Sequence, residues 1–200
     1  MPPEEPRPDP PDPAGILPAG VRSRLVTAYR RPPREYHTLE HAGDVAKHVA
    51  GLGGNRACLL AAWFHDVVYE PTASDNEEQS ARLVEAWLDD DPDVAEAARL
   101  VRLTAAHRPA NDDDRQGAIL CDADLAILGS TPPVYEVYRS AVRREYRHVE
   151  EDDWRTGRSA VLRELLGRDP LFLTDEARER WEQRARANLA AELATLTGES

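Results

Sequence analysis

One apolar stretch ends in a pair of residues that an ordinary hydrophobic core does not accept. Residues 57–64 are apolar on every side, which predicts a buried helix rather than an amphipathic one. The run passes directly into His65 and Asp66 and then resumes as residues 67–69. A carboxylate or an imidazole in an apolar interior costs several kcal/mol, about as much as an unpaired buried polar group, unless a partner compensates. This pair therefore constrains the fold strongly.

A second apolar stretch carries two carboxylates. Residues 118–121 run into Asp122 and Asp124 before residues 125–128 complete the same predicted helix. A bound metal ion would compensate the burial of acidic and imidazole side chains that converge from different helices. The sequence therefore predicts a metal site, with one of the two aspartates as a ligand. The other aspartate would pair with an arginine or orient a ligand histidine.

The composition limits the class of protein. Two hundred residues with 41% hydrophobic content suffice for one domain with a core. A net charge of -12 argues against binding of a nucleic-acid backbone as the main function. The sequence contains no apolar run long enough to span a membrane and no secretory signal at its start, and Cys58 and Cys121 lie inside apolar runs. We therefore expect a cytoplasmic protein with reduced cysteines and no membrane partner.

The periodicity predicts a single all-α domain over residues 15–200, after a disordered tail rich in proline and acidic residues over 1–14. Apolar spacing, proline and glycine positions predict helices over residues 21–30, 38–52, 56–69, 74–88, 92–107, 118–128, 132–148, 152–166 and 174–196. The helix over residues 74–88 opens with the spacing of a capping box. The sequence contains no alternating stretch long enough for a strand and no internal repeat.

The candidate ligands come from three of these helices. His41 lies in the helix over residues 38–52, the His-Asp pair ends the buried helix, and Asp122 or Asp124 lies in a third. Adjacent residues on a helix diverge by about 100°, so His65 and Asp66 share one ion only if it lies off the end or side of their helix; otherwise Asp66 bridges two ions. Imidazoles mixed with carboxylates favour Mn, Fe, Co, Ni or Zn over Ca or Mg.

Three strings resemble the HD-domain superfamily of metal-dependent phosphohydrolases. Residues 36–45 (YHTLEHAGDV) resemble the Tyr-His-Asn-x-x-His-x-x-Asp-Val signature of cyclic-nucleotide phosphodiesterases. Residues 63–70 (WFHDVVYE) are similar to the His-Asp segment of the stringent-response alarmone hydrolases, and residues 123–125 match the Ala-Asp-Leu string of both. The combination with residues 76–80, 122–129, 144–146 and 185–189 resembles a bacterial subfamily of predicted HD phosphohydrolases over roughly residues 25–193.

The resemblance implies roles for particular residues. It implies the metal ligands His41, His65, Asp66 and Asp124, which favours Asp124 over Asp122. His37 matches the phosphodiesterase histidine that protonates the leaving oxygen, and Glu70 matches the second of two acids in alarmone hydrolases. The chain departs from these patterns where Tyr69 replaces the first acid and Thr38 replaces the asparagine, and no second histidine follows the His-Asp pair.

Two further residues are candidate substrate contacts. Arg34 suits bidentate binding of phosphate, with an ion pair to Glu35 as the alternative. His107 would contact phosphate or a second metal ion, or would simply end a helix where the dipole favours it. Glu77 is predicted to be a surface residue, with contact to the site as the less favoured alternative.

Together these features predict a phosphohydrolase with one or two divalent transition-metal ions. It would use metal-activated water on a small phosphorylated metabolite, with a nucleotide favoured, and it could form a homodimer. One alternative is a ligand-sensing module that binds metal without turnover. Another is an HD-type di-iron oxygenase, which is disfavoured because it needs further histidine ligands and only His107 is available.

Overall fold

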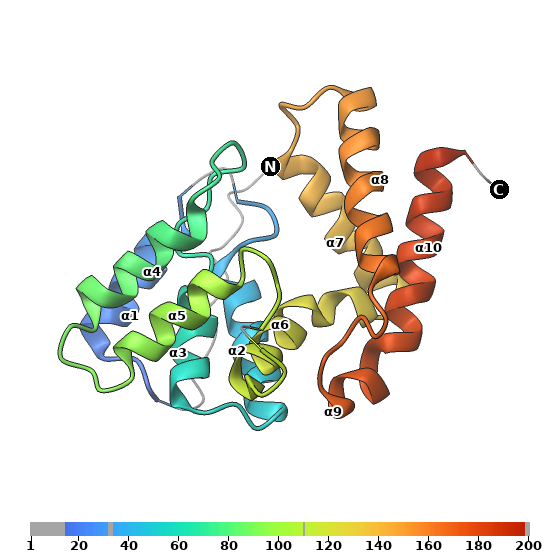
Figure 1. Cartoon of the computed structure of the whole chain (residues 1–200). Helices are drawn as coiled ribbons and strands as arrows, with labels where there is room; N and C mark the ends of the chain where they lie inside the picture. The colour runs from blue at the N-terminus through green and yellow to red at the C-terminus, as the bar shows by residue number, and fades with distance from the viewer. Residues whose placement is uncertain (1–14, 32–33, 110, 199–200) are drawn as a thin grey trace.

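The computed structural model describes residues 15–31, 34–109 and 111–198, and every regular element in these residues is helical (Figure 1). The all-α prediction is therefore confirmed for the described part of the chain. The predicted tail over residues 1–14 lies outside the described residues. No helix in the described ranges has the length and apolar character needed to cross a bilayer.

The helices follow one another with short connections. In chain order they are α1 (Ala19–Tyr29), α2 (Leu39–Gly51), α3 (Arg56–Phe64), α4 (Asn76–Trp87), α5 (Val94–Leu103), α6 (Arg115–Leu125), the 3-10 turn η1 (Ala126–Gly129), α7 (Pro132–Glu145), α8 (Glu151–Gly167), α9 (Asp175–Ala177), the π turn η2 (Arg178–Glu182) and α10 (Gln183–Thr197). Figure 1 shows α1 to α5 grouped on one side, α7, α8 and α10 on the other, and α6 between them.

The core of the first group lies around α3. This helix is apolar on all sides and packs against α2, α5 and α6. Leu60, Phe64, Leu100 and Ile119 are fully buried in it. Burial of each such side chain contributes about 1.5–3 kcal/mol, so this packing holds the ends of α2, α3 and α6 close together.

Side-chain caps define where the three site-bearing helices begin. The Thr38 hydroxyl accepts a hydrogen bond from the main-chain N–H of His41 at the start of α2. Asn55 caps α3 and Asp114 caps α6 in the same manner. Each such cap is worth about 1 kcal/mol. Thr38 thus stabilises the first turn of α2, which carries His41.

A buried ion pair joins the helices of the second group. Arg158 of α8 donates to both carboxylate oxygens of Glu192 on α10, at 2.8 and 3.0 Å. The Tyr135 hydroxyl of α7 donates to the same carboxylate at 2.5 Å. The close approach of η1 to η2 joins the end of α6 to the start of α10, because a Cβ at Gly129 would lie 2.4 Å from that of Trp181.

Several predicted boundaries differ from the structure. The buried helix predicted over residues 56–69 ends at Phe64, so His65 and Asp66 lie in the turn that follows it. The predicted capping box is wrong, since the N-cap of α4 is Asp75 and no side chain caps it. The helix predicted over residues 174–196 is confirmed in extent, but a π turn interrupts it.

Candidate metal centre

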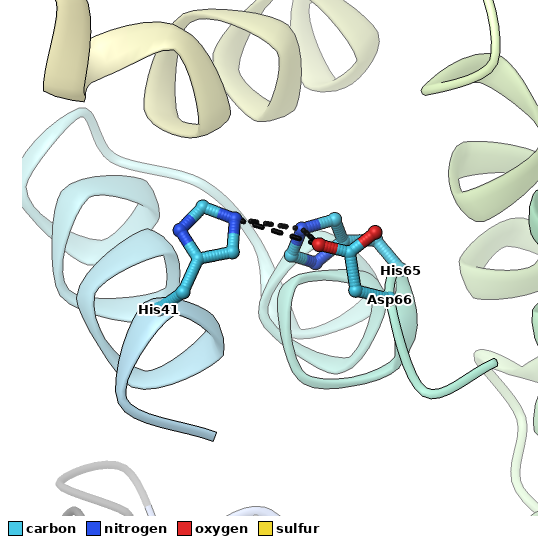
Figure 2. Close-up of side chains that lie close together, drawn as sticks. All are labelled: His41, His65 and Asp66. Atoms are coloured by element: carbon cyan, nitrogen blue, oxygen red, sulfur yellow. Dashed lines mark hydrogen bonds and ion pairs between the residues drawn. The ribbon is translucent and has the colours of Figure 1, made fainter. Parts of the chain in front are cut away.

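Three predicted ligands meet where the first turn of α2 lies beside the C-terminal end of α3. His41 Nε2 lies 3.2 Å from His65 Nε2 and 3.6 Å from Asp66 Oδ2, and His65 Nε2 lies 3.0 Å from that same oxygen (Figure 2). The three donor atoms all lie within 4.8 Å of one another. Because α3 ends before His65, the two adjacent residues of the pair direct their side chains to one point.

Asp124 of α6 adds a fourth donor beside the two imidazoles. Its Oδ1 lies 3.1 Å from His41 Nε2 and 3.5 Å from His65 Nε2. Donor atoms bound to one transition-metal ion at about 2.1 Å are separated by roughly 3.0 Å in octahedral geometry and about 3.4 Å in tetrahedral geometry. The distances from the two imidazole nitrogens to each other and to the two carboxylates, 3.0–3.6 Å, are close to those values, so the donor set fits a divalent transition metal.

The hydrogen bonding of His65 suits a metal ligand. Its Nδ1 donates to the carbonyl oxygen of Ala62 at 2.9 Å, which leaves the Nε2 lone pair directed at the cluster. His65 is 2% exposed and His41 is 8% exposed. Two buried imidazole nitrogens that face each other at 3.2 Å repel unless a cation or a shared proton lies between them. A bound cation satisfies both rings at once.

The cluster is strongly polarised. Burial alone would lower the pKa of His65, but the charges of Asp66 and Asp124 raise it well above its ordinary value. Burial alone would raise the pKa of each of these two carboxyls, yet the neighbouring histidines hold both pKa values below the usual range. A metal ion that binds here therefore displaces protons from imidazole, so its affinity should fall as the pH falls.

Asp122 lies outside the cluster and has a structural role. Its carboxylate accepts hydrogen bonds from the main-chain N–H groups of Leu173 and Thr174 and from the Thr174 hydroxyl, at 2.7–2.8 Å. The choice between the two aspartates is thereby made by geometry, and Asp124 is the residue beside the histidines. Asp122 instead connects α6 to the segment that precedes α9.

His37 forms a dyad with a residue that the sequence analysis did not single out as functional. Its Nδ1 donates to Glu145 Oε2 at 2.6 Å. The other oxygen of Glu145 accepts main-chain N–H groups of residues 35, 36 and 37 at 2.8, 2.8 and 3.1 Å. The sequence signal was present, because Glu145 follows Ala141 and Val142 on the buried face of α7, where a glutamate is unexpected.

The environment of His37 favours its protonated form. Burial alone would lower the pKa of His37, but the charge of Asp66 and the hydrogen bond and charge of Glu145 raise it above its ordinary value. The ring stacks on that of Tyr69, with centroids 4.0 Å apart. His37 is therefore oriented on one side by Glu145 and on its face by Tyr69, and it lines the same cavity as the cluster.

A cavity of about 440 Å³ opens beside the cluster. Its polar wall contains His37, His65, Asp66 and Asp124. The remaining lining is aromatic, aliphatic or charged: Tyr36, Tyr69, Tyr138, Leu125, Ile127, Leu128, Val161, Leu165, Arg108, Arg158, Arg168, Glu77 and Glu164. This volume lies within the range of small-molecule sites, roughly 300–1,000 Å³. The site thus combines a metal-binding end with apolar and basic walls.

No protein-family model, curated protein or solved structure matches this chain. The likeness to HD-domain phosphohydrolases therefore rests on the motif residues quoted above. The geometry of those residues is an independent observation, since four side chains from α2, the end of α3 and α6 lie at one place.

The phosphate-clamp role predicted for Arg34 finds no support, because other groups occupy its guanidinium. Nη1 donates to the carbonyl oxygens of His37 and Asp66 at 3.0 and 2.5 Å, and Nη2 donates to that of Val67 at 2.7 Å. Burial lowers its pKa from the ordinary value, and nearby charges oppose this only in part. Arg34 connects the loop before α2 to the turn after α3, so it positions His37 and Asp66.

The acid predicted at Glu70 also lies away from the cluster. Glu70 is exposed and accepts a hydrogen bond from the Thr72 hydroxyl at 3.1 Å, and it does not line the cavity. Glu77, in the first turn of α4, does line the cavity. The less favoured sequence alternative for Glu77 therefore describes its position better.

His107 contacts Asp124, a role that differs from the predicted phosphate or second-metal contact and from the predicted helix end. Its Nε2 is 2.8 Å from Asp124 Oδ2, so it orients that carboxylate toward the two imidazoles, and it also lines the cavity. Its backbone has a φ of 46°, in the left-handed region that a non-glycine residue adopts at an energetic cost. In this conformation the ring lies against the carboxylate of Asp124.

Proposed function

We propose that this protein is a metal-dependent phosphohydrolase with an HD-type helical arrangement that acts on a small phosphorylated metabolite. One observation carries the proposal: four imidazole and carboxylate donors converge beside His37, which is hydrogen-bonded to Glu145, at the wall of a small-molecule cavity. When bound there, a divalent transition metal supplies an acidified water and a polarised phosphoryl oxygen. A nucleotide remains the favoured substrate.

Other residues of the chain would donate the proton, orient the cluster and exclude water. His37 carries the proton that the leaving oxygen takes as the P–O bond breaks, and Glu145 holds the imidazole in place for that transfer. His107 keeps Asp124 turned toward the two histidines. The apolar walls exclude water from the substrate's organic part, which strengthens the electrostatic contacts at the phosphate.

The proposal is tested by assay of phosphate release. Protein purified without chelator should release inorganic phosphate from at least some nucleotides or sugar phosphates with added Mn, Co, Ni or Zn, and a chelator should abolish this turnover. The measurement is a colorimetric phosphate assay with each metal in turn, beside elemental analysis of the protein. Stoichiometric metal without turnover on any phosphate ester would instead indicate a sensing module.

His37 is assigned to protonation and not to metal binding. The variant His37→Ala should keep its metal and lose turnover by roughly 10²- to 10⁴-fold, the usual range for a lost general acid. The loss should be much smaller on p-nitrophenyl phosphate, because p-nitrophenolate leaves without a proton. The exposed His148→Ala is the matched control and should behave as wild type. Loss of metal, or equal losses on both kinds of substrate, would contradict the assignment.

A further inference from the structure

In the described part of the chain, two buried side-chain atoms without a hydrogen-bond partner belong to residues that line the active-site cavity, the Tyr69 hydroxyl and Nε of Arg168. Nε of Arg168, the residue that follows α8, is shielded from solvent and has no hydrogen-bond partner among the described residues. The side chain as a whole is 15% exposed, and its Nη2 donates to Glu164 Oε1 at 3.0 Å. An unsatisfied buried donor costs about 1–3 kcal/mol. Because solvent does not reach Nε in this arrangement, a ligand in the cavity would contact the terminal nitrogens of Arg168, and Nε would gain an acceptor only if the side chain moved.

Contacts from α10 fix the main chain around this arginine. Arg186 donates to the carbonyl oxygens of Leu166 and Arg168 at 3.1 and 2.6 Å, and its Nε donates to Glu182 at 2.7 Å. The guanidinium of Arg168 therefore extends from a held position. A pre-positioned guanidinium suits binding of a phosphate or a carboxylate.

Arg168 lies where the active-site cavity meets a second cavity. His107, Arg108, Leu125, Glu164 and Arg168 line both of them. The second cavity, of about 500 Å³, adds a third arginine, Arg163. The two spaces therefore share a wall that contains two arginines.

Three carboxylates, those of Asp122, Glu164 and Asp169, line the second cavity with the three arginines, so its formal charges balance. The Glu164 side chain is 63% exposed and that of Asp169 is 97% exposed, so water screens both carboxylates. The carboxylate of Asp122, which also lines the second cavity, is occupied by main-chain donors and the Thr174 hydroxyl. Arg108 and Arg163 are exposed as well, whereas the Arg168 side chain is 15% exposed. Water therefore screens Arg168 least of the three arginines, and its charge is the one most available to an anionic ligand.

We propose that Arg168, with Arg108 beside it, binds a second anionic group of the substrate, either a phosphate or a carboxylate. The proposal rests on the proposed function, in which the scissile phosphate lies at the metal cluster. The apolar side chains Leu125, Ile127 and Leu165 line the same cavity and would contact the organic part that joins the two anionic groups. The substrate class is thus a small phosphate ester with a second, separate negative group.

The test uses a series of alkyl phosphates with chains of three to eight carbons. Each chain ends in a methyl group, a carboxylate or a second phosphate, and binding to the metal-loaded protein is measured by calorimetry. The wild type should bind an anion-ended compound of the best length at least tenfold more tightly than its methyl-ended counterpart, since a charge-assisted contact is worth about 1.5–3 kcal/mol. Comparison of the carboxylate and phosphate series shows which group is bound.

Three variants make the test specific. Arg168→Gln should reduce the preference to less than about twofold, while Arg168→Lys, which keeps the charge but loses Nε, should retain part of it. Arg82→Gln removes an exposed arginine on α4 and should retain all of it. Circular dichroism verifies that each variant is folded. If Arg168→Gln is not folded, the lysine variant decides: a reduced preference for the anion-ended compounds supports the proposal, and an undiminished preference contradicts it.

Two outcomes would overturn the proposal: methyl-ended compounds that bind the wild type equally well, or an undiminished preference in the Arg168 variants. Phosphate release from the methyl-ended compounds tests the proposed function separately. Turnover without any preference refutes only the second anion site. A preference lost in Arg168→Gln without turnover of any compound refutes only the hydrolase.

Discussion

Alanine at Asp66 should leave the purified protein without bound transition metal and without phosphohydrolase turnover. The Asp66 carboxylate lies 3.0 Å from the imidazole of His65 and 3.6 Å from that of His41, so its removal opens the cluster and leaves the two buried histidines with Asp124 as their remaining carboxylate partner. Loss of a residue that merely supports a ligand costs about 10- to 100-fold in metal affinity or activity, and loss of a ligand should cost more. Elemental analysis and a phosphate-release assay measure both effects.

The matched control lies on α6, where two aspartates differ only in position. Asp124→Ala should lose metal as Asp66→Ala does, whereas Asp122→Asn should keep it. Asp122→Asn should instead lower the free energy of unfolding by about 1–3 kcal/mol, because an amide NH₂ replaces one acceptor opposite main-chain donors. Retention of full metal content by Asp124→Ala would show that this carboxylate is not a ligand.

Alanine at Glu145 should give the largest loss of stability among the site variants. The side chain is fully buried and accepts hydrogen bonds from the imidazole of His37 and from three main-chain N–H groups before α2. Removal leaves these donors without their acceptor, which should lower the free energy of unfolding by about 2–4 kcal/mol. Urea denaturation measures this change. Glu151→Ala, which removes an exposed glutamate on α8, should change it by less than about 0.5 kcal/mol.

The same carboxylate gives the stability a dependence on acidity. Burial alone would raise the pKa of Glu145, but the hydrogen bond and charge of His37 and the main-chain donors lower it to about 2. Because this folded-state pKa lies below the unfolded value, Glu145 stabilises the fold at neutral pH and loses that effect as the pH falls from about 4.5 to about 2. Glu145→Gln should flatten this part of the stability profile, and an unchanged profile would contradict the pKa.

The sequence was most informative where chemistry conflicts with the hydrophobic pattern. His65 and Asp66 at the end of an apolar run predicted a buried polar cluster, and the structure places both beside His41. The helical class followed from periodicity for the same reason, since apolar spacing reports burial directly. Both predictions use information that lies within a few neighbouring residues.

Residues whose role depends on distant partners were harder to assign. Arg34 and Glu70 carry the right chemistry for a phosphate site. However, the guanidinium of Arg34 is hydrogen-bonded to main-chain carbonyls, and the side chain of Glu70 is exposed. Glu145 lies 108 residues beyond His37 in sequence but forms its closest hydrogen bond. Local patterns contain no information about which groups meet across such separations.

The sequence by itself therefore determined the helical class and two cluster residues, His65 and Asp66, because burying such groups in an apolar run is too costly without a shared partner. The motif resemblance added His41. The resemblance favoured Asp124 over Asp122, but only the tertiary structure showed which aspartate lies beside the histidines. Both aspartates lie on one helix with the same local surroundings, and their roles differ because α6 meets the two histidines on one face and residues 173–174 on another. The packing of helices sets those faces, and it depends on contacts across the whole chain.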